Sequence, residues 1–183
     1  MNYTLPHTIE NGQGEKITFK EIIQEPDGAK VRIEGRCKLN AGPAMHIHYL
    51  QDEGFTILQG RAGCQIAGEE AKYYSEGESV IFKKNIAHKF WNAGSDELII
   101  DAWVKPVNSL IFFLDTLYAA QRNSGSSQPE AFDAAYLLVK YKNEYGMAEM
   151  PLPVRKIIIP LTYFFGHLFG KYKKFKNAPK PIK

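Results

Sequence analysis

Short apolar runs separated by turn residues fill residues 16–106, and they restrict the fold more than any other feature of the sequence. Each run has the length of a β-strand, and the breaks between runs are rich in Gly, Pro, Asn and Asp, as at 26–28 and 40–43. Strands at this close spacing are typical of an antiparallel sandwich or barrel. No helical pattern alternates with them, which argues against a parallel βαβ architecture. We therefore expect a mainly β domain here.

After Pro106 the apolar spacing becomes helical. Leucine and phenylalanine side chains recur at every third or fourth position between 110 and 117, which predicts an amphipathic helix over 108–122. Asn108 or Ser109 is suited to cap its first turn. The linker 104–108 is therefore the predicted boundary between a β-barrel domain over 1–106 and a C-terminal helical extension over 107–183.

The extension contains signals for two further helices. Pro129 suits the first turn of a second helix, which we expect Gly146 to close. Residues 153–170 are apolar nearly all round and predict a third helix, kinked at Pro160. The extension is thus expected to hold three helices and a basic end.

The charges of the chain are distributed unevenly. Residues 151–183 contain eight Lys and Arg residues and no Asp or Glu, which leaves 15 basic and 20 acidic residues in 1–150. A charge difference of this kind between two parts of a chain points to a charged partner for one of them.

Targeting and disulfide signals are weak in this sequence. Two cysteines, Cys37 and Cys64, are too few for a disulfide scaffold, and we expect Cys64 to be a buried, unreactive thiol. The first 15 residues are polar and do not resemble a secretory signal. No stretch reaches the roughly 18 apolar residues of a membrane-spanning helix. We expect a reduced, cytoplasmic protein.

Histidines at 46, 48 and 88 and a glutamate at 53 form the most informative pattern for function. Residues i and i+2 of a strand project to the same side, so His46 and His48 share one face, and Glu53 at the start of the next strand can reach the same point. Three imidazoles and one carboxylate suit Fe, Mn, Ni, Cu or Zn. A His-x-His pair also occurs in ordinary half-polar strands, so the pair alone leaves metal binding open.

The spacing of these residues resembles the two motifs of the cupin superfamily. The first motif is matched by Gly42, His46-Ile-His48, four residues, Glu53, six residues and Gly60. The second is matched by Gly77, five residues, Lys83-Lys84-Asn85, two residues, His88, three residues and Asn92. The resemblance covers residues 16–106.

Two positions depart from the cupin pattern. Gly42 lies closer to His46 than the first motif requires, and Lys83-Lys84-Asn85 replaces a Pro-x-Gly turn. Asn tolerates a left-handed backbone better than most residues, so we expect the turn to survive at Asn85. All four ligand positions match.

The resemblance implies a small antiparallel jelly-roll barrel with one divalent transition metal (Fe, Mn, Ni, Cu or Zn) inside it. The metal ligands carried over are His46, His48, Glu53 and His88. Strand alternation from these residues places Phe55 and Phe90 on the inner side, where they are candidates for substrate binding or ordinary core residues. The chain is also similar to small bacterial single-domain cupins that have a Phe/Leu-rich helical region and a basic end after the barrel.

The basic, aromatic segment 153–176 has two interpretations. Its apolar side chains could enter the headgroup region of a lipid bilayer while its lysines meet anionic lipid, which would make this segment a peripheral membrane contact. The interpretation we adopt is packing on the barrel or on a second subunit, and we expect a homodimer. Nucleic acid is not an expected partner, because no recognised nucleic-acid motif accompanies the basic residues.

The function we expect is a metal-dependent enzyme that acts on a small organic molecule in the barrel. The resemblance favours a dioxygenase-type oxidoreductase, with isomerase chemistry as another option. The alternative is a non-catalytic, small-molecule-binding cupin whose helical tail mediates dimerisation or membrane-surface attachment. A fold of this kind hosts many chemistries, so the reaction must be argued from the site.

Overall fold

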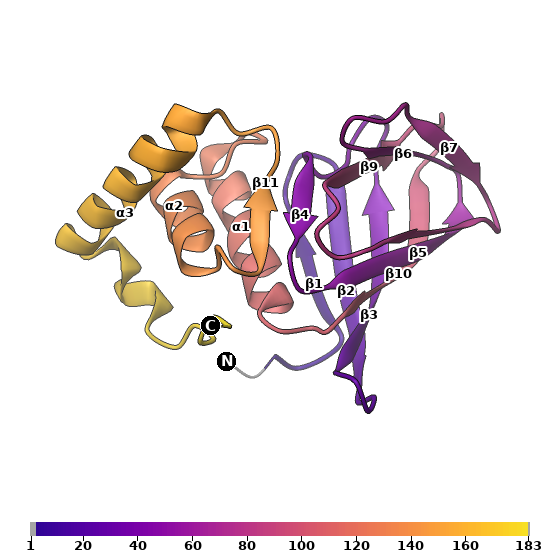
Figure 1. Cartoon of the computed structure of the whole chain (residues 1–183). Coiled ribbons are helices and arrows are strands. Elements are labelled where there is room, and N and C mark those ends of the chain that lie inside the picture. Colours follow the sequence, from indigo (N-terminus) through magenta and orange to yellow (C-terminus); the bar gives the residue numbers. More distant parts are fainter. Residues whose placement is uncertain (1–2, 183) are drawn as a thin grey trace.

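Two antiparallel sheets and a neighbouring group of helices make up the computed structural model, which describes residues 3–182 (Figure 1). One sheet contains, in spatial order, β1 (His7–Glu10), β2 (Glu15–Ile23), β3 (Lys30–Cys37), β10 (Leu98–Lys105), β5 (Asp52–Gln59) and β8 (Ser79–Phe82). The other contains β11 (Tyr145–Met147), β4 (His46–His48), β9 (His88–Asn92), β6 (Arg61–Ile66) and β7 (Lys72–Ser75).

The apolar core lies between the two sheets. Strands β3 and β10 pair in an antiparallel register and alternate strictly between buried and partly exposed side chains. This alternation follows from the period of two in a strand, which turns every second side chain inward. Phe55 on β5 and Phe90 on β9 meet across the gap, with ring centroids 5.0 Å apart. The predicted class, a mainly β antiparallel jelly roll followed by helices, is confirmed.

Three strands were not among the predicted runs, and one of them corrects a prediction. Strands β1 and β7 extend the two sheets at their edges. Strand β11 comes from the helical extension and pairs with β4, so that Gly146 lies opposite Ile47. The expectation that Gly146 closes the second helix is therefore wrong. This glycine is needed for close packing instead, because a Cβ there would lie 2.4 Å from the hydroxyl of Tyr49.

The helices of the extension begin near the predicted positions. Their bounds are α1 (Leu110–Ser124), α2 (Ala131–Lys140), the π-helical turn η1 (Val154–Ile158), α3 (Ile159–Leu168) and the 3-10 helix η2 (Lys171–Phe175). Ser109 is at the N-cap position of α1, but its hydroxyl donates to Glu144 and makes no capping hydrogen bond. Pro129 lies two residues before α2 and outside its first turn. The π turn ends two residues before Pro160, which lacks the N–H for an ordinary helical bond.

Aromatic rings pack the extension together. Tyr172 is buried and stacks near Tyr136 and Tyr163, and Phe175 stacks on Tyr136 with centroids 4.4 Å apart. None of the helices in residues 3–182 is both long and apolar enough to cross a membrane. The division of the chain into 1–106 and 107–183 remains a prediction, and β11 shows that the second part contributes a strand to the sheets.

Candidate metal centre

The four predicted ligand residues meet between the two sheets. His46 and His48 are the first and last residues of β4, and His88 is the first residue of β9, which pairs with β4 through His46 and His88. Glu53 comes from β5 on the opposite sheet. The sheets therefore contribute three imidazoles from one side and a carboxylate from the other.

Glu53 lies at the centre of this group. Its Oε2 atom is 4.0 Å from Nε2 of His46, 3.3 Å from Nε2 of His48 and 3.7 Å from Nε2 of His88. One ligand atom from each of the four residues lies within 4.8 Å of the other three. Donor atoms this close can share one metal ion, although their assignment as ligands remains a prediction.

Backbone carbonyls fix the orientation of two of the imidazoles. Nδ1 of His46 lies 2.9 Å from the carbonyl oxygen of Ala44, and Nδ1 of His88 lies 2.8 Å from that of Ile86. A carbonyl only accepts, so each Nδ1 carries a proton, and in the neutral form of each ring the lone pair is on Nε2. Both contacts reach the residue two positions earlier, and both turn the basic nitrogen toward Glu53.

Burial and mutual contact shift the pKa values in this group. Burial lowers the pKa of His48 to about 3; the charge of Glu53 opposes this shift and those of His46 and His88 add to it. Burial would raise the pKa of Glu53, but its contacts with His46 and His88 outweigh burial and hold that pKa well below the usual 4.5. His48 is thus neutral and Glu53 ionised near pH 7, the forms in which each can bind a cation.

Two buried nitrogens of the group lack hydrogen-bond partners among residues 3–182. They are Nε2 of His88 and Nδ1 of His48. Only 1% of the His88 side chain is exposed, so water is kept from it, and its bare Nε2 faces Glu53. Buried polar groups in native proteins are normally paired. A metal ion coordinated by His88 would satisfy this nitrogen, so the residues fit a metal.

The loops before the two histidine strands are held by specific contacts. Asn85 has a φ of 66°, the left-handed conformation expected from the altered turn, and its N–H donates to the carbonyl of His48. Asp52 accepts hydrogen bonds from the Lys84 N–H and the Lys83 ammonium, both at 2.9 Å. Gly42 passes so close to β9 that a Cβ would lie 2.1 Å from the Phe90 carbonyl. The left-handed Asn85 thus preserves the altered turn, and the close approach to β9 requires a glycine at position 42.

A family comparison agrees with this arrangement. Residues 36–104 match the family model described as the cupin domain, and the matched range contains all four predicted ligands. Residues 36–104 of the chain are therefore a cupin domain.

Two curated relatives carry the name oxidoreductase. The oxidoreductase iacF of Pestalotiopsis fici is 26% identical over 134 residues, which are 64% of this chain and 66% of that protein. The probable oxidoreductase virH of Hypocrea virens is 27% identical over 95 residues, which are 47% of this chain and 43% of that protein. The matched region thus spans less than two thirds of the length of either relative.

Solved structures resemble parts of this cupin. A protein with a double-stranded β-helix domain from Klebsiella pneumoniae has 17% identity and a TM-score of 0.42, covering 58% of this chain and 78% of its own. KdgF from a Halomonas species has 18% identity and a TM-score of 0.44, covering 54% of this chain and 84% of its own.

Aromatic side chains line the cupin core beside the four ligands. Phe82 stacks on His88 with ring centroids 4.1 Å apart and planes 8° from parallel. Phe55 lies between Phe82 and Phe90, at 6.2 Å and 5.0 Å. Phe55 is fully buried, whereas Phe90 is half-buried. Both lie on the inner side as predicted, and their role in substrate binding remains a prediction. Sequence analysis did not identify Phe82, although its strand alternates toward the core.

A second layer of polar residues comes from the helical extension. Tyr145 on β11 is the register partner of His48, and their rings meet edge to face at 5.5 Å. The neighbouring Glu144 is fully buried and accepts hydrogen bonds from Ser109 and Gln51. The Tyr145 hydroxyl accepts a hydrogen bond from Gln51 at 3.1 Å. Nothing in the local sequence connects residues 144–145 with His48, so only the fold reveals this support.

Cys64 is also buried near the site. Burial and then the charge of Glu53 raise its pKa to about 12, so the thiol stays protonated near pH 7. A protonated, buried thiol is a poor nucleophile, in agreement with its predicted passive role.

Proposed function

We propose that this cupin is a metal-dependent oxidoreductase of the dioxygenase type that acts on a small organic molecule at the His46, His48, Glu53 and His88 cluster. The observation that carries the proposal is the convergence of four donor atoms within 4.8 Å between two sheets. The names of the two curated relatives support oxidoreductase chemistry.

The donor set fits one divalent transition metal: Fe, Mn, Ni, Cu or Zn. His46, His48 and His88 would hold it through Nε2, and Glu53 through a carboxylate oxygen. When bound, such an ion supplies Lewis acidity and, for the redox-active metals, electron exchange with dioxygen.

The surrounding residues would prepare the site for this chemistry. The Phe82 ring covers one face of His88 and, with Phe55, keeps water from the inner side of the cluster. His46 has the most exposed side chain of the four, at 19%, so we place the approach of the substrate on its side. The homodimer and the cytoplasmic location expected from the sequence remain predictions.

Elemental analysis of the purified protein tests the metal site. We expect about one transition metal per chain in the wild type and a loss of at least about tenfold in His88→Ala. His167→Ala, which alters an exposed histidine outside the cluster, is the matched control and should retain the metal. Stoichiometric metal in His88→Ala would contradict the ligand assignment.

Oxygen uptake with a panel of dicarbonyl and phenolic compounds tests the reaction. A dioxygenase consumes dioxygen together with one compound, and this consumption should disappear in His88→Ala but not in His167→Ala. An isomerase would convert a compound without oxygen uptake. A compound bound in stoichiometric amounts without turnover would favour the alternative of a non-catalytic binding cupin.

A further inference from the structure

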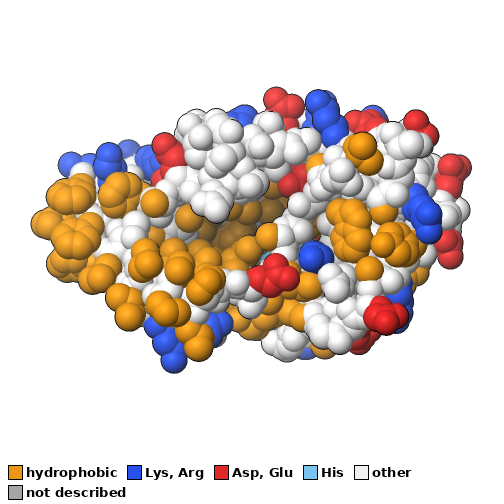
Figure 2. All heavy atoms as spheres, turned by 90° about the horizontal axis from the view of Figure 1, so that it is seen from above, with side chains coloured by type: hydrophobic (Ala, Val, Ile, Leu, Met, Phe, Trp, Pro, Cys, Tyr) orange, Lys and Arg blue, Asp and Glu red, His pale blue; other side chains and the backbone are white. Residues whose placement is uncertain are grey.

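Helix α3 exposes an apolar stripe to solvent. Leu161, Phe164, Phe165, Leu168 and Phe169 recur at helical spacing, and between 44% and 67% of each residue is exposed. Residues three, four, seven and eight positions apart lie on one side of a helix. Figure 2 shows these hydrophobic side chains gathered at the helical end of the molecule, at its left. A monomeric protein seldom exposes a continuous apolar patch of this kind unless the patch binds a partner.

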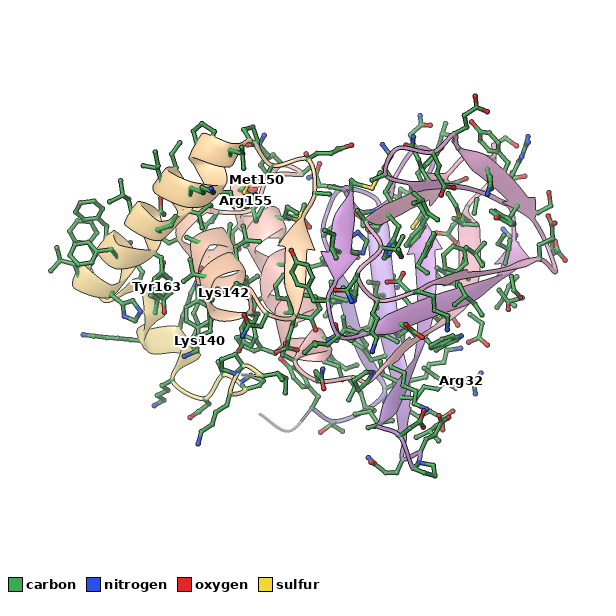
Figure 3. The ribbon with its side chains drawn as sticks, viewed as in Figure 1. Arg32, Lys140, Lys142, Met150, Arg155 and Tyr163 are labelled. Atoms are coloured by element: carbon green, nitrogen blue, oxygen red, sulfur yellow. The ribbon has the colours of Figure 1, made fainter. Side chains whose placement is uncertain are left out.

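The opposite side of α3 is already used for packing. Tyr163, labelled in Figure 3, lies on that side, with its ring 5.3 Å from Tyr172 and 6.3 Å from Tyr136 of α2. Gly166 is buried against Tyr172, so close that a Cβ would lie 2.3 Å from its ring. The helix is therefore fixed to the extension mainly by this side. Within the stripe, Phe169 meets Phe132 of α2 edge to face, with ring centroids 6.5 Å apart, and still exposes 62% of its surface.

Basic residues surround the stripe. Arg155 and Lys156 precede α3, and Lys171 and Lys173 follow it, all with exposed side chains. Among residues 151–182, the one ion pair with a carboxylate is that of Lys174 with Asp133, at 2.6 Å. Blue basic atoms border the apolar region in Figure 2. The partner of this face must therefore accept apolar side chains and supply negative charge.

We propose that the exposed face of α3 binds the surface of an anionic lipid bilayer. Its Phe and Leu side chains would enter the headgroup boundary while the flanking Lys and Arg residues contact acidic headgroups. The acidic excess of residues 1–150 would turn the sheets away from the bilayer. This proposal replaces the packing interpretation adopted from the sequence.

A second copy of the chain fits this face less well. A symmetric pair uses the same patch on both subunits, so it would bring two basic segments together with no acidic residue between 151 and 183 to offset them. The charges thus favour an anionic partner.

Co-sedimentation of the full-length protein with phosphatidylcholine vesicles, with and without phosphatidylglycerol, tests the proposal. We expect wild type to bind the anionic vesicles at low salt, and to be released by high salt. Phe164→Ser/Leu168→Ser should weaken binding by more than about tenfold. Arg155→Gln/Lys156→Gln/Lys173→Gln should weaken it by about a hundredfold at low salt.

Leu58→Ser/Ile81→Ser is the matched control, because it removes two apolar side chains of similar exposure from β5 and β8. It should bind vesicles like the wild type. Equal binding of Phe164→Ser/Leu168→Ser and the control would overturn the proposal. A second result would also overturn it: no binding of the wild type to vesicles, together with a wild-type dimer in analytical ultracentrifugation that becomes a monomer in Phe164→Ser/Leu168→Ser. That result would identify a second copy of the chain as the partner.

Discussion

Glu15 is not one of the four predicted ligands, but its carboxyl group lies near enough to His46 for their charges to interact. It accepts a hydrogen bond from Asn11 at 2.7 Å and one from the Tyr118 hydroxyl at 2.9 Å. Burial raises the pKa of Glu15 above 4.5, and the two hydrogen bonds only partly offset this rise. The folded protein therefore holds a proton on Glu15 at pH values where the unfolded chain has released it.

This proton sets the sign of a pH effect on stability. Between pH 4.5 and the raised pKa, the folded state binds more protons, so the free energy of unfolding contributed by Glu15 falls as pH rises. Glu15→Gln removes the titration. We expect the free energy of unfolding of Glu15→Gln, relative to that of wild type, to rise with pH over this range. The total rise is about 1.4 kcal/mol for each pH unit by which the pKa of Glu15 is raised in the folded state.

Urea unfolding of chelator-treated protein across a pH series measures this difference. Glu70→Gln, at an exposed position, is the control and should differ from wild type by a constant amount. A constant difference for Glu15→Gln as well would show that Glu15 does not retain its proton in the folded state.

At the scale of secondary-structure elements, the buried carboxylate of Glu144 joins four parts of the chain. Its Oε2 atom accepts from the Ser109 hydroxyl at 2.9 Å, the Ser109 N–H at 3.3 Å and Gln51 at 3.4 Å. Its Oε1 atom accepts from the Ile182 N–H at 3.4 Å. The Glu144 side chain thereby accepts a hydrogen bond from the backbone N–H at the N-terminus of α1. Glu144 thereby fixes β11, which in turn pairs with the strand of His46 and His48.

Glu144→Ala should destabilise the protein by about 3 kcal/mol or more, because it leaves several buried donors without an acceptor. We also expect a lower metal content, since β11 would no longer be held against β4. Denaturant unfolding and elemental analysis measure the two effects. Glu149→Ala, at an exposed position five residues away, should change neither. If Glu144→Ala behaved like Glu149→Ala, Glu144 would not be the link between the extension and the site.

The sequence predicted the strands that supply the ligands, because their apolar runs are long and their motif spacing is specific. It did not predict β11, whose three residues show no alternation and whose pairing with β4 is set by tertiary packing. Gly146 was misassigned for the same reason: a glycine after a helical stretch resembles a helix terminus. The stacking of Phe82 on His88 depends on how two facing sheets are placed, which strand periodicity cannot give.

At the scale of the whole molecule, residues of the helical extension contact the sheets at several separate places. β11 completes one sheet, Tyr118 of α1 contacts Glu15 of β2, and the Ile182 N–H returns to Glu144. These contacts favour one cooperative unit over two independently stable domains.

Tyr172→Ala tests this cooperativity from the far end of the chain. Removing a buried aromatic ring costs about 3–5 kcal/mol. Both tryptophans, Trp91 and Trp103, lie in strands, so their fluorescence reports on the sheets, while far-UV circular dichroism reports on the helices. We expect both signals to shift to lower temperature together. A shift in circular dichroism alone would instead support independent domains at 1–106 and 107–183.

Tyr172→Phe is the matched variant. The Tyr172 hydroxyl is buried and has no hydrogen-bond partner within residues 3–182, so its removal should leave stability unchanged or raise it. A large loss in Tyr172→Phe would indicate that the hydroxyl is paired in solution.

The pairing of β11 with β4 has a consequence for the order of events during protein synthesis. The ribosome makes His46 and His48 long before it makes Tyr145–Met147, the strand that pairs beside them. Until then the nascent chain carries its histidines on an open sheet edge, where other chains can pair. A chain that stopped between His88 and Tyr145 would carry all four predicted ligands but an unfinished sheet around them. The sheet beside the predicted ligands is therefore complete only after residues 145–147 have been made.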